Sequence, residues 1–245
     1  MCKELFLSWQ SSKTREWFPV ARLSKIGEEF SFRYTKGAKE AKASGFVGLA
    51  GFSSFDKLYL SNTIFPVLQN RIMNKSRPDR DEYLSWLGLD SETHSDFEEL
   101  ARTGGVKATD NLQLYPIPEP KNGLYQFQFF VHGISHLPEN YKDRTYRLQP
   151  DDSLFLMPDV QNQQDKDAIS LRTEDPVELV GYVPKFFTQD FIALFRANPN
   201  QFNIKVKKLN VDAPEQFALL CELTAPWPDD FKPLNNASFK ALVNP

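Results

Sequence analysis

The chain has 245 residues, 41% of them hydrophobic and 25% charged, which argues against an intrinsically disordered protein. Its length suits one large domain or two ordinary ones. The net charge of −3 argues against a protein that coats nucleic acid generally, and two cysteines are too few for a disulfide framework or a zinc site. No apolar run approaches the roughly 18 residues that a membrane span needs, and the first residues lack the apolar core of a signal peptide. We therefore expect a cytoplasmic protein that makes no membrane contact.

Charge is distributed unevenly along the chain. Residues 1–80 carry 14 lysines and arginines against 7 acids, residues 81–120 carry 2 against 9, and residues 121–245 carry 13 against 16. An anion-attracting surface is therefore expected within residues 1–80. An equally good interpretation is that these basic side chains are solvated and that acidic side chains lie near them in the folded chain.

The first half of the chain predicts a small set of strands followed by helices. Apolar residues bounded by polar turns predict strands at 5–9, 17–23, 30–34 and 111–115. Helical spacing and end signals predict helices at 36–44 and 62–74, one from Pro78 to Gly88, and one from Ser95 to Gly104. Ser95 and Glu98 have the spacing of a capping box. This order predicts an α+β domain.

A stretch with three prolines, residues 116–123, separates the two halves and predicts a domain boundary between residues 118 and 119. We thus expect an α+β domain over residues 1–118 and a second domain over residues 119–245. In the second, alternating residues predict strands at 125–133, 144–148, 152–158, 167–172, 178–184, 202–209 and 217–225, with a helix at 185–197. Many short strands at even spacing predict a small β-barrel.

Residues 1–118 are similar to the first N-terminal subdomain of HipA-type proteins. The similarity lies in FRYTKG at 32–37, IFP at 64–66, NRIMNKS at 70–76, LSWLGL at 84–89 and GVKATDNLQLYP at 105–116. In HipA proteins the comparable subdomain takes part in contacts with the partner antitoxin. The resemblance therefore implies that this chain docks on a regulatory protein.

Residues 154–184 carry a more specific pattern. A strand leads into a loop that contains Asn162 and Asp165, Ala168 and Ile169 open the next strand, and Gly-Tyr-Val-Pro follows at 181–184. With FFVHGI at 129–134, this order resembles HIRAN domains over residues 124–198. The resemblance implies a modified OB-like barrel that holds single-stranded DNA or a DNA 3′ end. In such a site an aromatic side chain stacks on a base and an acid accepts a hydrogen bond from the terminal hydroxyl.

The resemblance also implies a set of nucleic-acid-binding residues: Phe129, Phe130, His132, Asn162, Asp165, Tyr182 and Lys185. Asp165 stands at the position of the acid and Asn162 at that of the loop amide. Phe129 and Phe130 stand where the DNA-binding members have a basic residue and a tyrosine, and Gln164 stands where they have an aromatic. Structural roles are open alternatives, namely an Asx turn for Asp165 and a core position for Phe129.

Catalytic chemistry has little support in the sequence. His132 and His136 flank a glycine at a strand end, so they do not form a metal pair on one helix face. The segment GGVKATD at 104–110 lacks the Gly-Lys-Ser/Thr ending of a phosphate-binding loop. A metal-dependent nuclease that uses turn carboxylates such as Asp165 and Asp167 is the alternative. We expect a binding protein without catalytic residues, metal or cofactor.

Overall fold

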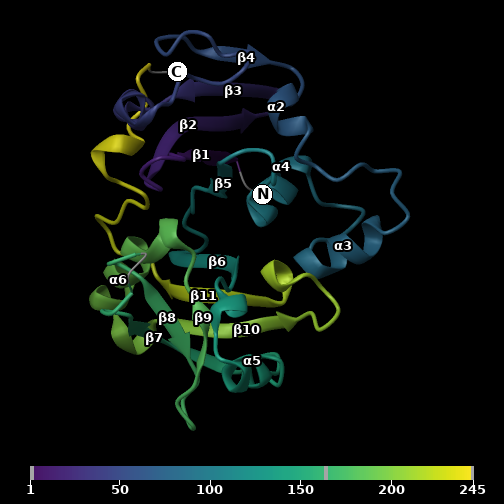
Figure 1. The fold of residues 1–245 in the computed structure, drawn as a ribbon, viewed down its shortest axis with the longest axis vertical. Helices are drawn as coiled ribbons and strands as arrows, with labels where there is room; N and C mark the ends of the chain where they lie inside the picture. The colour runs from purple at the N-terminus through teal and green to yellow at the C-terminus, as the bar shows by residue number, and fades with distance from the viewer. Residues whose placement is uncertain (1–2, 163–164, 244–245) are drawn as a thin grey trace. The chain divides into compact units, whose positions relative to one another are not determined.

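The computed structural model describes residues 3–162 and 165–243, which form two compact units (Figure 1). The first unit contains the described residues up to Asp81, Asp90–Ile117 and the described residues from Leu234 onward. The second contains Glu82–Leu89 and Pro118–Pro233. Each unit therefore includes a segment that is remote from the rest of it in sequence. We predict from the sequence that residues 1–118 and 119–245 fold independently, and this stays a prediction.

A five-stranded antiparallel sheet forms the centre of the first unit. Its order is β4-β3-β2-β1-β5. The strands are β1 (Glu4–Gln10), β2 (Trp17–Ile26), β3 (Glu29–Tyr34), β4 (Tyr59–Ser61) and β5 (Leu112–Pro116). The four strands predicted for this half are confirmed, and β4 is an additional edge strand.

Four helices belong to the first half of the chain: α1 (Lys36–Ala41, continued by the 3-10 turn η1, Lys42–Ser44), α2 (Pro66–Gln69), α3 (Arg80–Leu87) and α4 (Asp96–Thr103). The capping box of α4 is confirmed, because the Ser95 side chain accepts from the Glu98 N–H while the Glu98 side chain accepts from the Ser95 N–H. The predicted helix at 62–74 is wrong in extent, since only α2 forms there. Beyond it, the Met73 N–H bonds to the buried Glu99 carboxylate instead of a carbonyl one turn back.

The core of the first unit lies on one face of its sheet. Its buried strand residues include Leu5, Leu7, Leu23, Phe32 and Tyr34, and the helices contribute Ala38, Ala41, Leu68, Phe97 and Leu100. Each such Leu or Phe contributes about 1.5–3 kcal/mol by leaving water. Phe32 and Phe52 stack with ring centroids 3.8 Å apart, so part of the high Phe content is explained here.

The second unit is built on a six-stranded antiparallel sheet of order β6-β11-β10-β7-β8-β9. The strands are β6 (Leu124–Phe130), β7 (Ser153–Pro158), β8 (Ile169–Arg172), β9 (Leu179–Tyr182), β10 (Asn203–Leu209) and β11 (Leu219–Pro226). His132, just beyond β6, exchanges backbone hydrogen bonds of 2.9 and 2.8 Å with Tyr182 of β9. This bridge joins the two ends of the strand order, so the sheet curls into a barrel. The expected α+β class with an OB-like barrel is confirmed.

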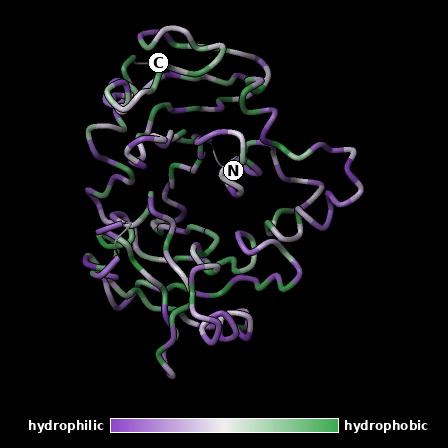
Figure 2. Tube along the Cα trace, viewed as in Figure 1, coloured by the Kyte–Doolittle hydropathy of each residue, from purple (hydrophilic) through white to green (hydrophobic). Residues whose placement is uncertain are grey.

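Helices α5 (Glu139–Thr145) and α6 (Thr188–Ala197) accompany the barrel, with 3-10 turns at η2 (Ile134–His136), η3 (Lys185–Phe187), η4 (Pro199–Gln201) and η5 (Glu215–Phe217). A further 3-10 turn, η6 (Ala237–Phe239), belongs to the first unit. The helix predicted at 185–197 is confirmed as η3 and α6. The strand predicted at 144–148 is wrong, because residues Glu139–Thr145 form α5, which follows Pro138 at its N-cap. Helix α5 is mainly hydrophilic (Figure 2).

Aromatic rings fill the inside of the barrel. Phe127 and Phe129 stack on one face of β6 with centroids 6.1 Å apart. The ring centroid of Phe187 lies 4.3 Å from that of Phe127, and the ring centroid of Phe191 in α6 lies 5.3 Å from that of Phe129. The predicted shared face of Phe127 and Phe129 is therefore the core face, and α6 closes it.

Candidate nucleic-acid interface at the barrel closure

Two glycines make the closure between His132 and Tyr182 possible. Gly181 has φ = 134°, and a Cβ there would lie 2.3 Å from Val131 Cγ1 and 2.7 Å from the His132 carbonyl oxygen. Gly133 has φ = 72°, and a Cβ there would lie 2.9 Å from Tyr182 Cδ2. Only glycine fits these contacts and conformations without strain. The Tyr182 ring therefore lies directly against the backbone of Gly133.

The Tyr182 hydroxyl is held by a carboxylate from another loop. It donates to Asp159 Oδ2 at 2.9 Å, and Asn162 Nδ2 donates to the same oxygen at 3.1 Å. Desolvation raises the pKa of Tyr182, and the hydrogen bond to Asp159 raises it further. The phenol therefore keeps its proton at neutral pH and remains a donor to Asp159.

Asp165 links the same loop to the segment that follows β9. Its Oδ2 lies 3.1 Å from Lys185 Nζ, and its backbone N–H donates to Asn162 Oδ1 at 2.9 Å. Its Oδ1 accepts from the Asp167 N–H at 3.1 Å, so the expected turn role of Asp165 is also present. The side chains of Lys185 and Asp165 are 49% and 21% exposed, so solvent screens their ion pair and it contributes about 0–1 kcal/mol.

These contacts bring together most of the predicted site residues. We call the following set the closure network: His132, Asp159, Asn162, Asp165, Tyr182 and Lys185. His132 joins it through its backbone, and the residue is exposed to solvent. The side chains of the network thus include one lysine, two carboxylates, one amide and one phenol, and its residues come from three chain segments. Gln164, the loop position compared with an aromatic, lies outside the described residues.

Phe129 and Phe130 are placed differently from the rest of the predicted set. Phe129 is 3% exposed in the barrel core, and Phe130 is 6% exposed on the opposite face of β6. Phe130 packs with Leu220 and with Leu87 of α3, and its ring centroid lies 5.3 Å from that of Phe217. In this structure neither phenylalanine presents a ring face to a ligand.

Residues 82–89 cover Phe130 and are fixed to the barrel by polar contacts at the end of α3. Lys208 Nζ donates to the Ser85 hydroxyl oxygen at 3.0 Å and also bonds the Ser85 carbonyl oxygen. Asn210 Nδ2 donates to the Trp86 carbonyl oxygen at 2.9 Å. A lysine and an amide therefore satisfy carbonyl groups that the last turn of a helix leaves free, and the positive charge suits that end of the helix.

Asp159 is the member of the closure network that sequence reasoning missed. It follows Pro158 at the end of β7, where an aspartate is expected in a turn without further function. The available signal was its spacing of three residues from Asn162, which places two polar side chains on the same turn. The sequence did not show that Tyr182 lies above that turn.

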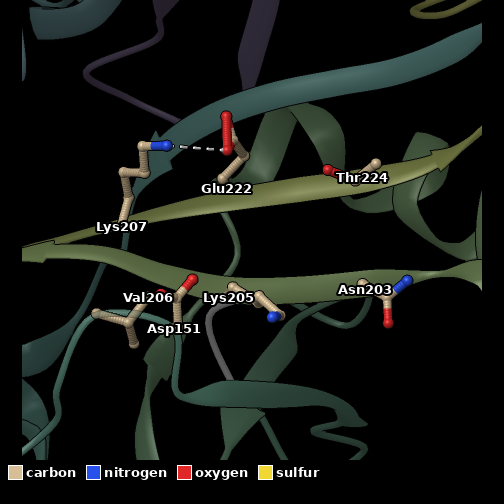
Figure 3. Close-up of a pocket in the computed structure, with 7 residues that line it drawn as sticks. All are labelled: Asp151, Asn203, Lys205, Val206, Lys207, Glu222 and Thr224. Carbon is tan, nitrogen blue, oxygen red and sulfur yellow. Dashed lines mark hydrogen bonds and ion pairs between the residues drawn. The ribbon is translucent and has the colours of Figure 1, made fainter.

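A polar hollow of about 400 Å³ lies on β10 and β11, apart from the closure network (Figure 3). Its lining is Asp151, Asn203, Lys205, Val206, Lys207, Glu222 and Thr224. Figure 3 shows Lys207 and Glu222 pointing toward one another, and their charged atoms are 3.4 Å apart. Glu222 Oε1 also accepts from Gln128 Nε2 at 2.9 Å. Two lysines and two acids line this hollow, so its formal charge is zero.

Within residues 3–162 and 165–243, no group of three or more histidine, cysteine, aspartate or glutamate side chains is arranged to hold a metal ion. Nor does that part of the chain contain a helix long and apolar enough to cross a membrane.

Comparison with known proteins places the barrel in a family. No curated protein matches the chain significantly. A structural-genomics crystal structure from Lactobacillus plantarum shares 18% identity over 42% of this chain and 97% of that chain, with a TM-score of 0.31. The HIRAN domain of human HLTF shares 16% identity over 44% of this chain and 78% of that chain, with a TM-score of 0.32. The model of the HIRAN domain family matches residues 124–225, so the barrel and its closure network form a HIRAN domain.

Proposed function

We propose that the HIRAN domain of this chain binds single-stranded DNA or a DNA 3′ end at the closure network, without catalysing a reaction. HIRAN domains are generally DNA-binding domains. The observation that carries the proposal is the convergence of Asn162, Asp165, Tyr182 and Lys185 at the point where the barrel closes.

Each side chain has a role that suits its chemistry. Lys185 contacts a backbone phosphate, because its side chain is 49% exposed and carries a positive charge. Asp165 accepts a hydrogen bond from the terminal 3′ hydroxyl, and a carboxylate at this position repels a terminal phosphate. The Lys185–Asp165 pair is weak enough for a ligand to rearrange it at low cost. Tyr182 and Asn162 hold the loop in place, and the exposed His132 borders it.

Titration with labelled oligonucleotides tests the proposal. Single strands with a free or a phosphorylated 3′ end are compared at low and moderate salt, and we expect binding that weakens with salt and favours the free end. Lys185→Met removes one phosphate contact, so the slope of log K against log salt should become shallower by about 0.7. Lys207→Met is the matched control, since Lys207 is 53% exposed and also paired with an acid. The proposal fails if no oligonucleotide shows salt-sensitive binding.

The second candidate function is a protein-interaction module that docks on a regulatory partner, as the similarity of residues 1–118 to HipA-type proteins implies. The burial of Phe130 favours it, because the ring expected to stack on a base is 6% exposed. A pull-down with the full chain as bait distinguishes the candidates. Recovery of nucleic acid with no accompanying protein would count against this second function.

A further inference from the structure

Two arginines lie side by side on the first unit's sheet, on the face opposite its core. In the antiparallel register of β2 and β3, Arg22 and Arg33 are direct cross-strand partners, as are Leu23 and Phe32 on the core face. Side chains of direct partners stand about 4.5–5.5 Å apart at their Cβ atoms, and like charges in such a pair repel. The arrangement is therefore unfavourable unless something else neutralises it.

Glu4 of β1 neutralises one of the two arginines. Arg22 Nε donates to Glu4 Oε1 at 3.0 Å, and Arg22 Nη2 contacts Glu4 Oε2. Ser24 Oγ also donates to Glu4 Oε1, at 2.7 Å. Burial alone would raise the pKa of Glu4, but the bonds from Arg22 and Ser24 outweigh burial and lower the pKa. Glu4 is therefore an anion already committed to Arg22.

Arg33 is left with a buried positive charge. It is 7% exposed, and its Nε is buried with no hydrogen-bond partner in the chain as described. Among the same residues, its guanidinium forms no ion pair. Burial and the charge of Arg22 lower the pKa of Arg33, whereas Glu4 raises it. A buried guanidinium nitrogen without a partner is unfavourable, so this position favours an added anion.

We propose that Arg33, together with Arg22, forms a binding site for a phosphate oxyanion. Two guanidinium groups against one carboxylate leave one surplus positive charge, which balances the single negative charge of a phosphodiester or of monoanionic phosphate. Guanidinium forks match the oxygens of such groups in pairs. A phosphate also has enough oxygens to reach both arginines. The Arg22 side chain is 30% exposed, so the anion has access beside it.

This site belongs to the first unit and does not rest on DNA binding by the HIRAN domain. Arg22 and Arg33 are two of the 14 lysines and arginines in the first 80 positions. The phosphate has two sources, a free phosphate compound or the backbone of a nucleic acid, and the chemistry of recognition is the same for both.

Thermal unfolding of the full chain tests the site. The melting temperature is measured in sodium phosphate and in sodium chloride at equal pH and ionic strength. We expect phosphate to raise it by a few degrees, since a ligand that binds only the folded state stabilises that state. Arg33→Met should abolish this rise and increase the melting temperature in chloride, because an unpaired buried charge is replaced by an apolar side chain of similar length. Arg15→Met, at an exposed arginine of the same unit, should keep the rise.

The site is overturned if phosphate has no effect on the wild type, or if Arg33→Met keeps the same rise as Arg15→Met. Calorimetric titration of the wild type with inorganic phosphate needs no variant, and an absence of saturable binding would also overturn it. An equal rise in sodium acetate would overturn the assignment to phosphate and favour a carboxylate. Displacement of inorganic phosphate by an abasic single-stranded oligonucleotide would support the site and would identify its ligand as the phosphate of a nucleic-acid backbone. Saturable binding of inorganic phosphate that the oligonucleotide does not displace would support the site and would identify its ligand as a free phosphate compound.

Discussion

The carboxylate of Asp159 joins two segments of the HIRAN domain, because one of its oxygens accepts hydrogen bonds from both Tyr182 and Asn162. Asn162 in turn accepts from the backbone of Asp165, which pairs with Lys185. A substitution at Asp159 is therefore expected to displace the groups proposed to bind DNA, although Asp159 itself is not proposed to contact DNA. We accordingly regard Asp159 as a positioning residue.

Asp159→Ala should lower the affinity for a single strand roughly tenfold or more, because hydrogen bonds to a charged group contribute about 1.5–3 kcal/mol each. Asp159→Asn keeps one acceptor for the Tyr182 hydroxyl and should recover part of the loss. Dissociation constants and melting temperatures are measured for both variants. Equal binding by both variants and the wild type would show that Asp159 has no positioning role.

Phe130→Ala should act on stability and leave end preference unchanged. The ring is buried between Leu220 and Leu87, so its removal leaves a cavity and costs about 3–5 kcal/mol. Urea unfolding measures this cost, and the ratio of affinities for blocked and free 3′ ends measures preference. A stable variant with an altered ratio would instead support base stacking on Phe130, as the family resemblance implies.

Secondary-structure elements differ in how far the sequence determines them. The capping box of α4 involves only Ser95 and Glu98, three residues apart, so it could be predicted from local pattern. The extent of α2 could not, because a distant carboxylate, that of Glu99, takes the Met73 N–H. The burial of Phe130 was equally inaccessible, since residues 82–89 come from the other half of the chain. Of the candidate site, the turn role of Asp165 was predictable, and the placement of Tyr182 against Asp159 was not.

The role of α3 as a cover for the barrel can be tested at Leu87, which is fully buried there. Leu87→Ala should reduce the free energy of unfolding by about 2–5 kcal/mol. Leu60→Ala is the control, since Leu60 is 55% exposed and its loss should change stability by less than about 0.5 kcal/mol. Denaturant unfolding followed by circular dichroism measures both. Equal stability of the two variants would mean that α3 does not stabilise the barrel.

For the chain as a whole, each unit depends on a segment from the other side of the junction at residues 117–118. A fragment that begins at residue 118 lacks residues 82–89 and leaves Phe130 and Leu220 uncovered. We expect this fragment to unfold at a lower temperature than the full chain and to bind a hydrophobic dye. Separate expression and thermal unfolding measure this. A fragment as stable as the full chain would support the division between residues 118 and 119 as an independent domain boundary.

Recognition of a strand end by the closure network is the central claim for the molecule, and one ratio tests it most directly. The dissociation constant for a single strand with a phosphorylated 3′ end is divided by that for the same strand with a free 3′ hydroxyl, in the wild type and in Asp165→Asn. We predict a ratio well above one for the wild type. In the variant the ratio should fall toward one while affinity for the blocked strand holds or rises, because a negative charge near the phosphates is removed. A wild-type ratio of one, or a ratio unchanged by Asp165→Asn, would contradict the claim.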